Sequence, residues 1–257
     1  MKVVLSIAGS DCSGGAGIQA DLKTFEAFGV FGCSAITVLT AQNTTGVTGI
    51  SEVSSDFVKE QLKAIFKDFE VSAIKIGMLF SNEIIDTIRI FIKELNIPIV
   101  LDPVFISKAG STLLSDDAIN NMKTLFPYVT IITPNLFEAK ALFDYKENDE
   151  LSKNNLQKQK FNVIVKNQKR DDKSVDTLFT NSMTKEFETA FIETRNTHGT
   201  GCSFSSAIAA NLALGKSLEE SIVISNKFIY EAIRNAPNLG QGKGPIAHKK
   251  GVECLKN

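Results

Sequence analysis

The sequence has no surplus of charge of either sign and almost no histidine. Its 28 Lys and Arg residues are balanced by 29 Asp and Glu residues, so no basic excess is available to neutralise a nucleic-acid backbone. His198 and His248 are the only histidines, which excludes a histidine-rich metal site. We therefore expect no nucleic-acid partner, and any metal ion would need oxygen ligands.

Cysteines and long apolar runs are scarce as well. Cys12, Cys33, Cys202 and Cys254 are widely spaced and form no C-x-x-C pair, which favours reduced thiols over a disulfide framework. The opening run "VVLSIA" is too short for the core of a signal peptide, and no other stretch approaches the length of a membrane span. These features predict a cytoplasmic protein without a membrane partner.

What is present is the composition and patterning of an α/β protein. Of 257 residues, 43% are hydrophobic and 22% are charged, as in ordinary globular domains. Runs rich in β-branched residues, such as "KVVLSIAG", "VSAIKIGM" and "FNVIVKN", alternate with segments of helical periodicity. This alternation predicts a mostly parallel central sheet with helices on both faces, formed by residues 1–257 as one domain. A hairpin turning at Asn181 and Ser182 and closing helices at 201–214 and 218–234 are also expected.

The stretch "NTHGTGCSFSSAIAANLALG" (196–215) places a glycine-rich turn before a helical run. The first N–H groups of such a helix are unpaired and lie at the positive end of its dipole, which favours an anion site at Gly199, Thr200 and Gly201. The same environment is expected to lower the pKa of Cys202 and favour its thiolate. An ordinary tight turn with a buried structural cysteine explains the spacing equally well.

A second glycine cluster, "AGSDCSGGAGIQAD" (8–21), also joins a strand to a helix. It matches neither G-x-G-x-x-G nor a P-loop, and the "GKS" at 215–217 follows a helix, so neither segment is a nucleotide motif of those kinds. An acidic residue such as Asp21 near a helix start usually only compensates the dipole.

Further polar residues follow strands, where the active sites of parallel sheets lie. Asp102 ends the apolar run "PIVLD", an unfavourable place for a carboxylate without a partner or a cation. Asn135 and Glu138 have a spacing that puts them on one helix face, and Lys166 ends "VIVK". Asp102 and Glu138 could hold Mg²⁺. A helix cap at Asn135 followed by a surface glutamate at Glu138 would explain that spacing equally well. An anion site, carboxylates and a lysine on one rim together suit phosphoryl transfer.

The chain resembles the ribokinase-like small-molecule kinases, and within them the hydroxymethylpyrimidine/phosphomethylpyrimidine kinases of thiamine biosynthesis. The resemblance covers nearly the whole chain and is carried by "AGSDCSGGAGIQADLKTFEAFGVFGCSAITVLTAQNTTGV", "KIGML", "LDPVFISKAGSTLL", "ITPNLFEA", "NTHGTGCSFSSAIAANLALG" and "GKGPIAH". It implies a three-layer ribokinase-like fold and an ATP- and Mg²⁺-dependent kinase. The substrate would be 4-amino-5-hydroxymethyl-2-methylpyrimidine and then its monophosphate.

The resemblance also implies a role for individual residues. Cys202 would accept the proton of the substrate hydroxyl, beside an anion hole built by Gly199, Thr200 and Gly201. The remaining assignments are Gly9, Asp21, Gln42 and Met78 to the aminopyrimidine, Asn135 and Lys166 to ATP, Asp102 and Glu138 to Mg²⁺, and Phe105 to Ser111 to a lid. Relatives are often homodimers, so a homodimer is expected.

The chain departs from the family pattern at two places. It has "VKNQKR" where the family commonly has "VKGGH", and the segment 143–161 is shorter than usual by roughly one helix. The altered loop leaves open a non-catalytic binding protein that kept the fold. A pyridoxal kinase is the alternative among enzymes, although residues 105–112 contain no cysteine of the kind that some such relatives carry in the lid.

Overall fold

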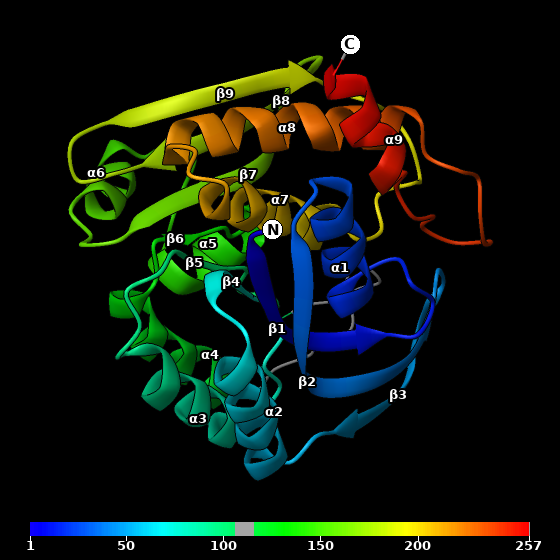
Figure 1. Cartoon of the computed structure of the whole chain (residues 1–257). Coiled ribbons are helices and arrows are strands. Elements are labelled where there is room, and N and C mark those ends of the chain that lie inside the picture. Colours follow the sequence, from blue (N-terminus) through cyan, green and yellow to red (C-terminus); the bar gives the residue numbers. More distant parts are fainter. Residues whose placement is uncertain (106–115, 257) are drawn as a thin grey trace.

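A nine-stranded sheet forms the centre of the computed structural model, which describes residues 1–105 and 116–256 (Figure 1). The strand order is β3-β2-β1-β4-β5-β6-β7-β8-β9. The bounds are β1 Val3–Asp11, β2 Phe31–Asn43, β3 Gly46–Glu52, β4 Val71–Ile76, β5 Ile99–Leu101, β6 Ile131–Ile132, β7 Asn162–Arg170, β8 Lys173–Phe179 and β9 Thr184–Ala190. The strands from β2 to β7 pair in parallel, whereas β3, β8 and β9 pair antiparallel at the two ends.

Helices cover both faces of this sheet. Figure 1 shows α2, α3 and α4 gathered on one side and α1, α7 and α8 on the other. The bounds are α1 Gly17–Ala27, α2 Ser55–Asp68, α3 Asn82–Ile92, α4 Asp116–Met122, α5 Leu136–Phe143, α6 Glu150–Gln157, α7 Thr200–Ala213, α8 Leu218–Arg234 and α9 His248–Glu253, with short 3₁₀ turns at Lys123–Tyr128 and Cys254–Lys256. Among the described residues, no helix is both long and apolar enough to cross a membrane.

The two-residue period of a strand explains how one sheet supplies two cores. Leu5 and Ile7 of β1 belong to the apolar cluster under α2 and α3, while Val4 belongs to the cluster under α1, α7 and α8. Both kinds of position are fully buried. Strands covered on both faces are therefore mostly apolar, as the sequence indicated, with Ser6 of β1 and Lys75 of β4 as buried polar exceptions.

The predicted fold class is confirmed, including the 173–190 hairpin and the two long closing helices. Two elements were missed. The edge strand β3 has the sequence "GVTGISE", which is too poor in apolar residues to predict a strand, and it forms only by pairing with β2. The short helix α9 follows a glycine-rich segment and packs against α8.

Candidate active site

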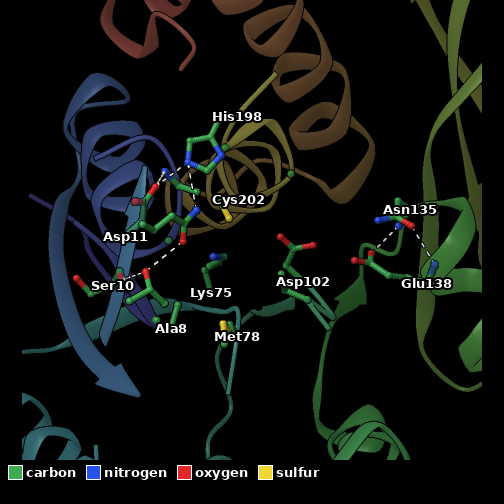
Figure 2. Close-up of a pocket in the computed structure, with 18 of the residues that line it drawn as sticks. Ala8, Ser10, Asp11, Lys75, Met78, Asp102, Asn135, Glu138, His198 and Cys202 are labelled. Carbon is green, nitrogen blue, oxygen red and sulfur yellow. Dashed lines mark hydrogen bonds and ion pairs between the residues drawn. The ribbon is translucent and has the colours of Figure 1, made fainter. Parts of the chain in front are cut away.

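A cavity of about 510 Å³ opens at the carboxyl ends of the parallel strands, where the sequence placed the site. It is lined by ten of the twelve predicted site residues: Gly9, Gln42, Met78, Asp102, Asn135, Glu138, Lys166, Gly199, Gly201 and Cys202. Figure 2 shows Cys202 near the centre, with Asp11 and His198 on one side and Asn135 and Glu138 on the other. The structure thus brings residues from six strand ends and three helix starts around one space.

The two glycine clusters of the sequence pack against each other. Gly199, the residue before α7, has a φ of +81°, and a Cβ there would lie 1.8 Å from the carbonyl oxygen of Gly15. Gly17, which begins α1, has a φ of +56°, and its Cβ would lie 2.3 Å from the carbonyl oxygen of Gly9. Only glycine permits these backbone contacts.

Both helices start without a side-chain cap. Neither Gly199 before α7 nor Ala16 before α1 supplies a side-chain acceptor to the first turn. The first turns of α1 and α7 are therefore not capped by their N-cap residues, the Gly17 N–H donates to Cys202, and two helix dipoles add positive potential there. This is the arrangement that binds phosphate in proteins.

The prediction of a lowered pKa for Cys202 is wrong. Burial raises the pKa of the thiol to about 11, and the carboxylates of Asp21 and Asp102 act in the same direction. Lys75 and a hydrogen bond from the backbone N–H of Gly17 lower it only in part. The sequence showed the helix start but not the loss of solvent around the sulfur.

Asp102 and Lys166 form an ion pair on the rim of the cavity. The Lys166 Nζ lies 2.5 Å from Asp102 Oδ1, and Thr133 and Ser205 donate longer hydrogen bonds of 3.2 and 3.4 Å to the same carboxylate. Burial alone would lower the pKa of Lys166, but Asp102 and Glu138 raise it above its usual value. The Asp102 carboxylate thus has the partner that its position at a strand end required.

Asn135 and Glu138 form a capping box at the start of α5. The Asn135 side chain accepts from the Glu138 N–H at 2.9 Å, and Glu138 Oε2 accepts from the Asn135 N–H at 2.8 Å. The glutamate is nevertheless 4% exposed and lines the cavity, so it is not a surface residue. Glu138 therefore both caps α5 and lines the cavity.

Gly9, Gln42 and Met78 lie on the opposite side of the cavity. A Cβ at Gly9 would come within 2.7 Å of Val38, so this wall is close-packed. Met78 packs on Val38 and Val104, while the Gln42 oxygen accepts from Thr40 at 3.1 Å. A flat wall of this kind, with one amide beside a thioether, suits a small aromatic ring with polar edges.

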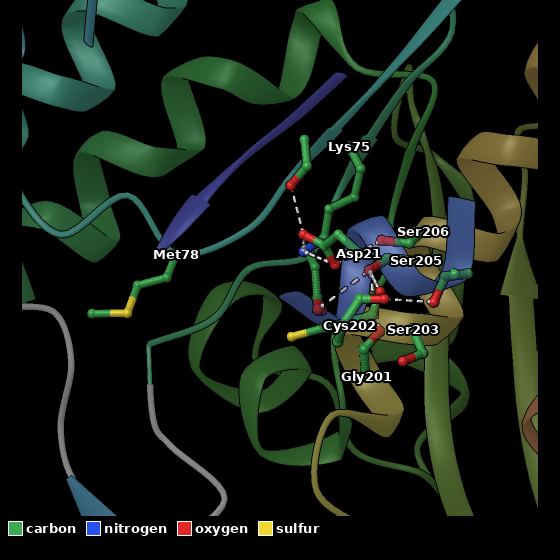
Figure 3. A network of polar contacts seen from close by, with 12 residues as sticks. Asp21, Lys75, Met78, Gly201, Cys202, Ser203, Ser205 and Ser206 are labelled. Atoms are coloured by element: carbon green, nitrogen blue, oxygen red, sulfur yellow. Dashed lines mark hydrogen bonds and ion pairs between the residues drawn. The ribbon is translucent and has the colours of Figure 1, made fainter. Parts of the chain in front are cut away.

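The structure places two predicted residues outside this cavity. Asp21 is fully buried beneath it, where its carboxylate is bonded to Lys75, Ser6 and Ser206 and has no route to a ligand (Figure 3). Thr200 bonds back to the Thr197 carbonyl and lines a second cavity instead. The family resemblance implied that Asp21 contacts the pyrimidine, but its side chain lies between α1 and the sheet, bonded to β1, β4 and α7.

Sequence reasoning missed three charged or titratable residues that line the cavity. Asp11 lies 2.7 Å from His198 Nε2 and also accepts from Ser13 and Ala16. Burial alone would raise the pKa of the Asp11 carboxylate, but hydrogen bonds from His198 and Ser13 lower it to about 2. Lys75 is the third, and a lysine inside the apolar run "SAIKIG" could have indicated it.

A second cavity of about 220 Å³ adjoins the first between β7, β8 and α8. Lys166 and Asn167 line both cavities. Asn167 has a φ of +62°, a conformation that asparagine adopts more readily than most residues with a side chain, and its N–H donates to Asp176 at 2.7 Å. The segment Asn167 to Arg170, expected as a loop, is thus part of β7, and the positive φ of Asn167 is a backbone form that glycine would also allow.

The Phe105 to Ser111 segment expected to form a lid lies outside the described residues, apart from Phe105, which is buried. Within the parts of the chain that the structure describes, no three His, Cys, Asp or Glu side chains are grouped closely enough to hold a metal ion by themselves.

Comparison with known proteins identifies the family. The model of the phosphomethylpyrimidine kinase family matches residues 11–247. A hydroxymethylpyrimidine/phosphomethylpyrimidine kinase of Staphylococcus aureus (strain MSSA476) is 38% identical over 257 residues, covering 96% of this chain and 93% of its own length.

Two solved structures have the same architecture. Pyridoxal kinase of Bacillus subtilis, solved as an ADP complex, superposes with a TM-score of 0.87 at 35% identity, covering 97% of this chain and 98% of the other. Phosphomethylpyrimidine kinase of Clostridium difficile 630 gives a TM-score of 0.78 at 40% identity, covering 91% and 100%. The fold is ribokinase-like, and the chain belongs to the phosphomethylpyrimidine kinase family.

Proposed function

We propose that this chain, as one kinase domain, transfers a phosphoryl group from ATP to the hydroxymethyl group of an aminopyrimidine, and then a second one to the monophosphate. One observation carries the proposal. The two uncapped helix starts around Cys202 face the same cavity as the Asp102–Lys166 pair and the wall formed by Gly9, Gln42 and Met78. Anion binding, charge neutralisation and ring recognition are thereby combined within one space.

The ring would lie against Met78 and Gly9, with the Gln42 amide at its amino and ring-nitrogen edge. An amide offers both a donor and an acceptor, which matches that edge. Asp21 has no part in this contact because its carboxylate is enclosed. The ring is thus held by packing and one amide, and its hydroxymethyl group is directed toward Cys202.

ATP would extend from the second cavity into the first. The second cavity has apolar walls from Phe191, Phe204 and Ile229 suited to a base, while Lys166 and Asn135 lie where the phosphates would pass. Lys166 stays charged next to Asp102 and can neutralise the transferring group.

The residues present fit Mg²⁺. Asp102 and Glu138 offer carboxylate oxygens to the same cavity as the phosphate-facing Lys166, and Mg²⁺ bound to nucleotides commonly uses only one or two protein carboxylates. When bound, the ion would neutralise charge on the phosphate oxygens of ATP. Asp102 would share its oxygens between this role and Lys166.

The proton of the substrate hydroxyl would pass to Cys202. With a pKa of about 11, the thiol is mainly protonated at neutral pH, so the accepting form is a minor one. A loose phosphoryl-transfer transition state asks little of a base until late in the reaction. The N–H groups of Gly201 and its neighbours therefore contribute more to the rate than the sulfur does.

The test is ATP turnover with hydroxymethylpyrimidine, with its monophosphate, and with pyridoxal. We expect the pyrimidine to have the highest kcat/KM and the monophosphate to be converted to the diphosphate. If kcat/KM for pyridoxal exceeds that for the pyrimidine by about tenfold or more, which is about 1.4 kcal/mol, the chain is a pyridoxal kinase instead. That alternative is favoured by one observation, the superposition on a pyridoxal kinase. Binding without turnover would point to a non-catalytic protein.

A homodimer and a cytoplasmic location remain predictions. Phe31, Leu39 and Ile50 are large apolar residues of β2 and β3 that stay exposed at one end of the sheet, as a subunit contact requires. Light scattering on the purified chain measures the assembly directly, and a mass of one chain would contradict the dimer.

A further inference from the structure

Lys75 and Asp21 form an ion pair at the floor of the cavity, which Lys75 lines and Asp21 does not. The ammonium of Lys75, on β4, lies 2.9 and 2.8 Å from the two oxygens of Asp21, on α1, and both side chains have no exposed surface (Figure 3). Breaking such a pair is costly, yet the pair itself is seldom more stable than apolar packing of the same volume. Stability alone is therefore a weak reason for its presence.

The Asp21 carboxylate ties four elements together. Ser6 of β1 donates to it at 2.6 Å, and Ser206 of α7 donates at 2.7 Å, in addition to Lys75 of β4. Ser206 lies four residues after Cys202, one turn further along the same face of α7. Asp21 thus ties the second turn of α7 to the sheet, one turn beyond the sulfur of Cys202.

The same pair supplies charge to Cys202. Lys75 and Cys202 line one cavity, and Lys75 favours the thiolate whereas Asp21 disfavours it. The other charged groups that face the sulfur are Asp102, after β5, and Lys166, on β7, which form a pair of their own. Two carboxylates and two ammonium groups therefore act electrostatically on the thiol, and removing any one of them changes the balance of charge there.

We propose that Asp21 and Lys75 are positioning residues for phosphoryl transfer, which hold the N-terminal half of α7 against the sheet and place opposed charges on the side of the site where Cys202 lies. The kinetic part of this inference rests on the proposed role of Cys202 as proton acceptor. The structural part does not, because the pair acts on the thiol whether or not the thiol is a base.

The test measures the alkylation of Cys202 by iodoacetamide against pH, without ATP or substrate, following the Cys202 peptide by mass spectrometry. Alkylation reports the thiolate. Lys75→Met should slow it about tenfold at a fixed pH near 8, which corresponds to a midpoint about one pH unit higher, and Asp21→Asn should speed it by a similar factor. The double variant should fall between the two.

A merely structural role would not change the alkylation rate in opposite directions in the two single variants. Loosening the fold would speed alkylation of Cys202 in both. Equal signs, or no shift in either, overturn the proposal. If Lys75→Met does not fold, Asp21→Asn and the double variant still decide, since slower or unchanged alkylation in Asp21→Asn contradicts the charge argument. The matched control is the exposed pair of Lys185 and Glu219, where Lys185→Met should leave the midpoint unchanged.

The pH profile of kcat separates this inference from the proposed function. If the rising limb of the kcat profile, where kcat increases with pH, moves with the alkylation midpoint in each variant, both are supported. If the midpoints separate as expected while the kcat profile stays fixed, the pair tunes the thiol but Cys202 is not the base. In that outcome the proposed role of Cys202 fails and the kinetic part of this inference fails with it.

Discussion

Two lysine–carboxylate pairs flank Cys202, and they differ in what surrounds them. Asp21 and Lys75 have no exposed surface, and every oxygen of Asp21 is met by donors within the protein at 2.6 to 2.9 Å. Asp102 and Lys166 both line the cavity, whereas only Lys75 of the first pair does, and the two hydroxyl contacts to Asp102 are long. The closed pair belongs to the scaffold, whereas the open pair can exchange partners when a ligand enters. A lysine–carboxylate ion pair therefore positions structural elements at Asp21 and Lys75, and is available for ligand binding at Asp102 and Lys166.

The substitution Lys166→Met tests this comparison with the largest expected effect. We expect kcat for phosphorylation to fall about 10²- to 10³-fold, because a charge that faces the transferring phosphoryl group is lost. Steady-state kinetics at saturating pyrimidine and ATP measure the effect. A fall of less than about fivefold would show that Lys166 does not face the phosphates.

The identical substitution at the closed pair should act mainly on stability. Lys75→Met leaves the Asp21 carboxylate without its cation in a site closed to water, and we expect about 3–5 kcal/mol less free energy of unfolding. Urea unfolding of the two lysine variants side by side measures the difference. A larger loss for Lys166→Met than for Lys75→Met would reverse the assignment of the two pairs.

Cys202, which lies between the pairs, gives the next effect. Cys202→Ala should reduce kcat about 10²-fold while the dissociation constant for the pyrimidine changes little, because the thiol handles a proton and does not hold the ring. Calorimetric titration beside initial-rate measurements separates the two quantities. A full rate in the alanine variant would remove Cys202 as proton acceptor.

The smallest effect is expected outside both pairs. Gln42→Ala should raise the KM for hydroxymethylpyrimidine about tenfold with kcat nearly unchanged, since a hydrogen bond to a neutral group contributes about 1 kcal/mol. Val104, on the same cavity wall, offers a control, because Val104→Ala removes packing without removing a hydrogen bond. Equal KM changes in the two variants would argue against a specific amide contact.

The sequence predicted the sheet edge and most of the site because both depend on local order along the chain. Apolar runs ending in polar residues located Asp102, Asn135 and Lys166, and glycine spacing located the start of α7. Asp21 was misplaced because a helix start does not reveal which way a side chain points in the folded protein. The raised pKa of Cys202 and the Asp11–His198 contact depend on burial and on long-range packing, which local patterns do not contain.

The contact between Gly15 and Gly199 has a consequence for how the protein folds. The anion site is made by two turns from opposite ends of the chain, with the backbone of one against the other. It can be completed only after the last third of the chain has been synthesised and has docked on the first. Because closing so long a loop costs entropy, we expect the site to form late in folding, with the sheet present in truncated or nascent chains before any catalytic power.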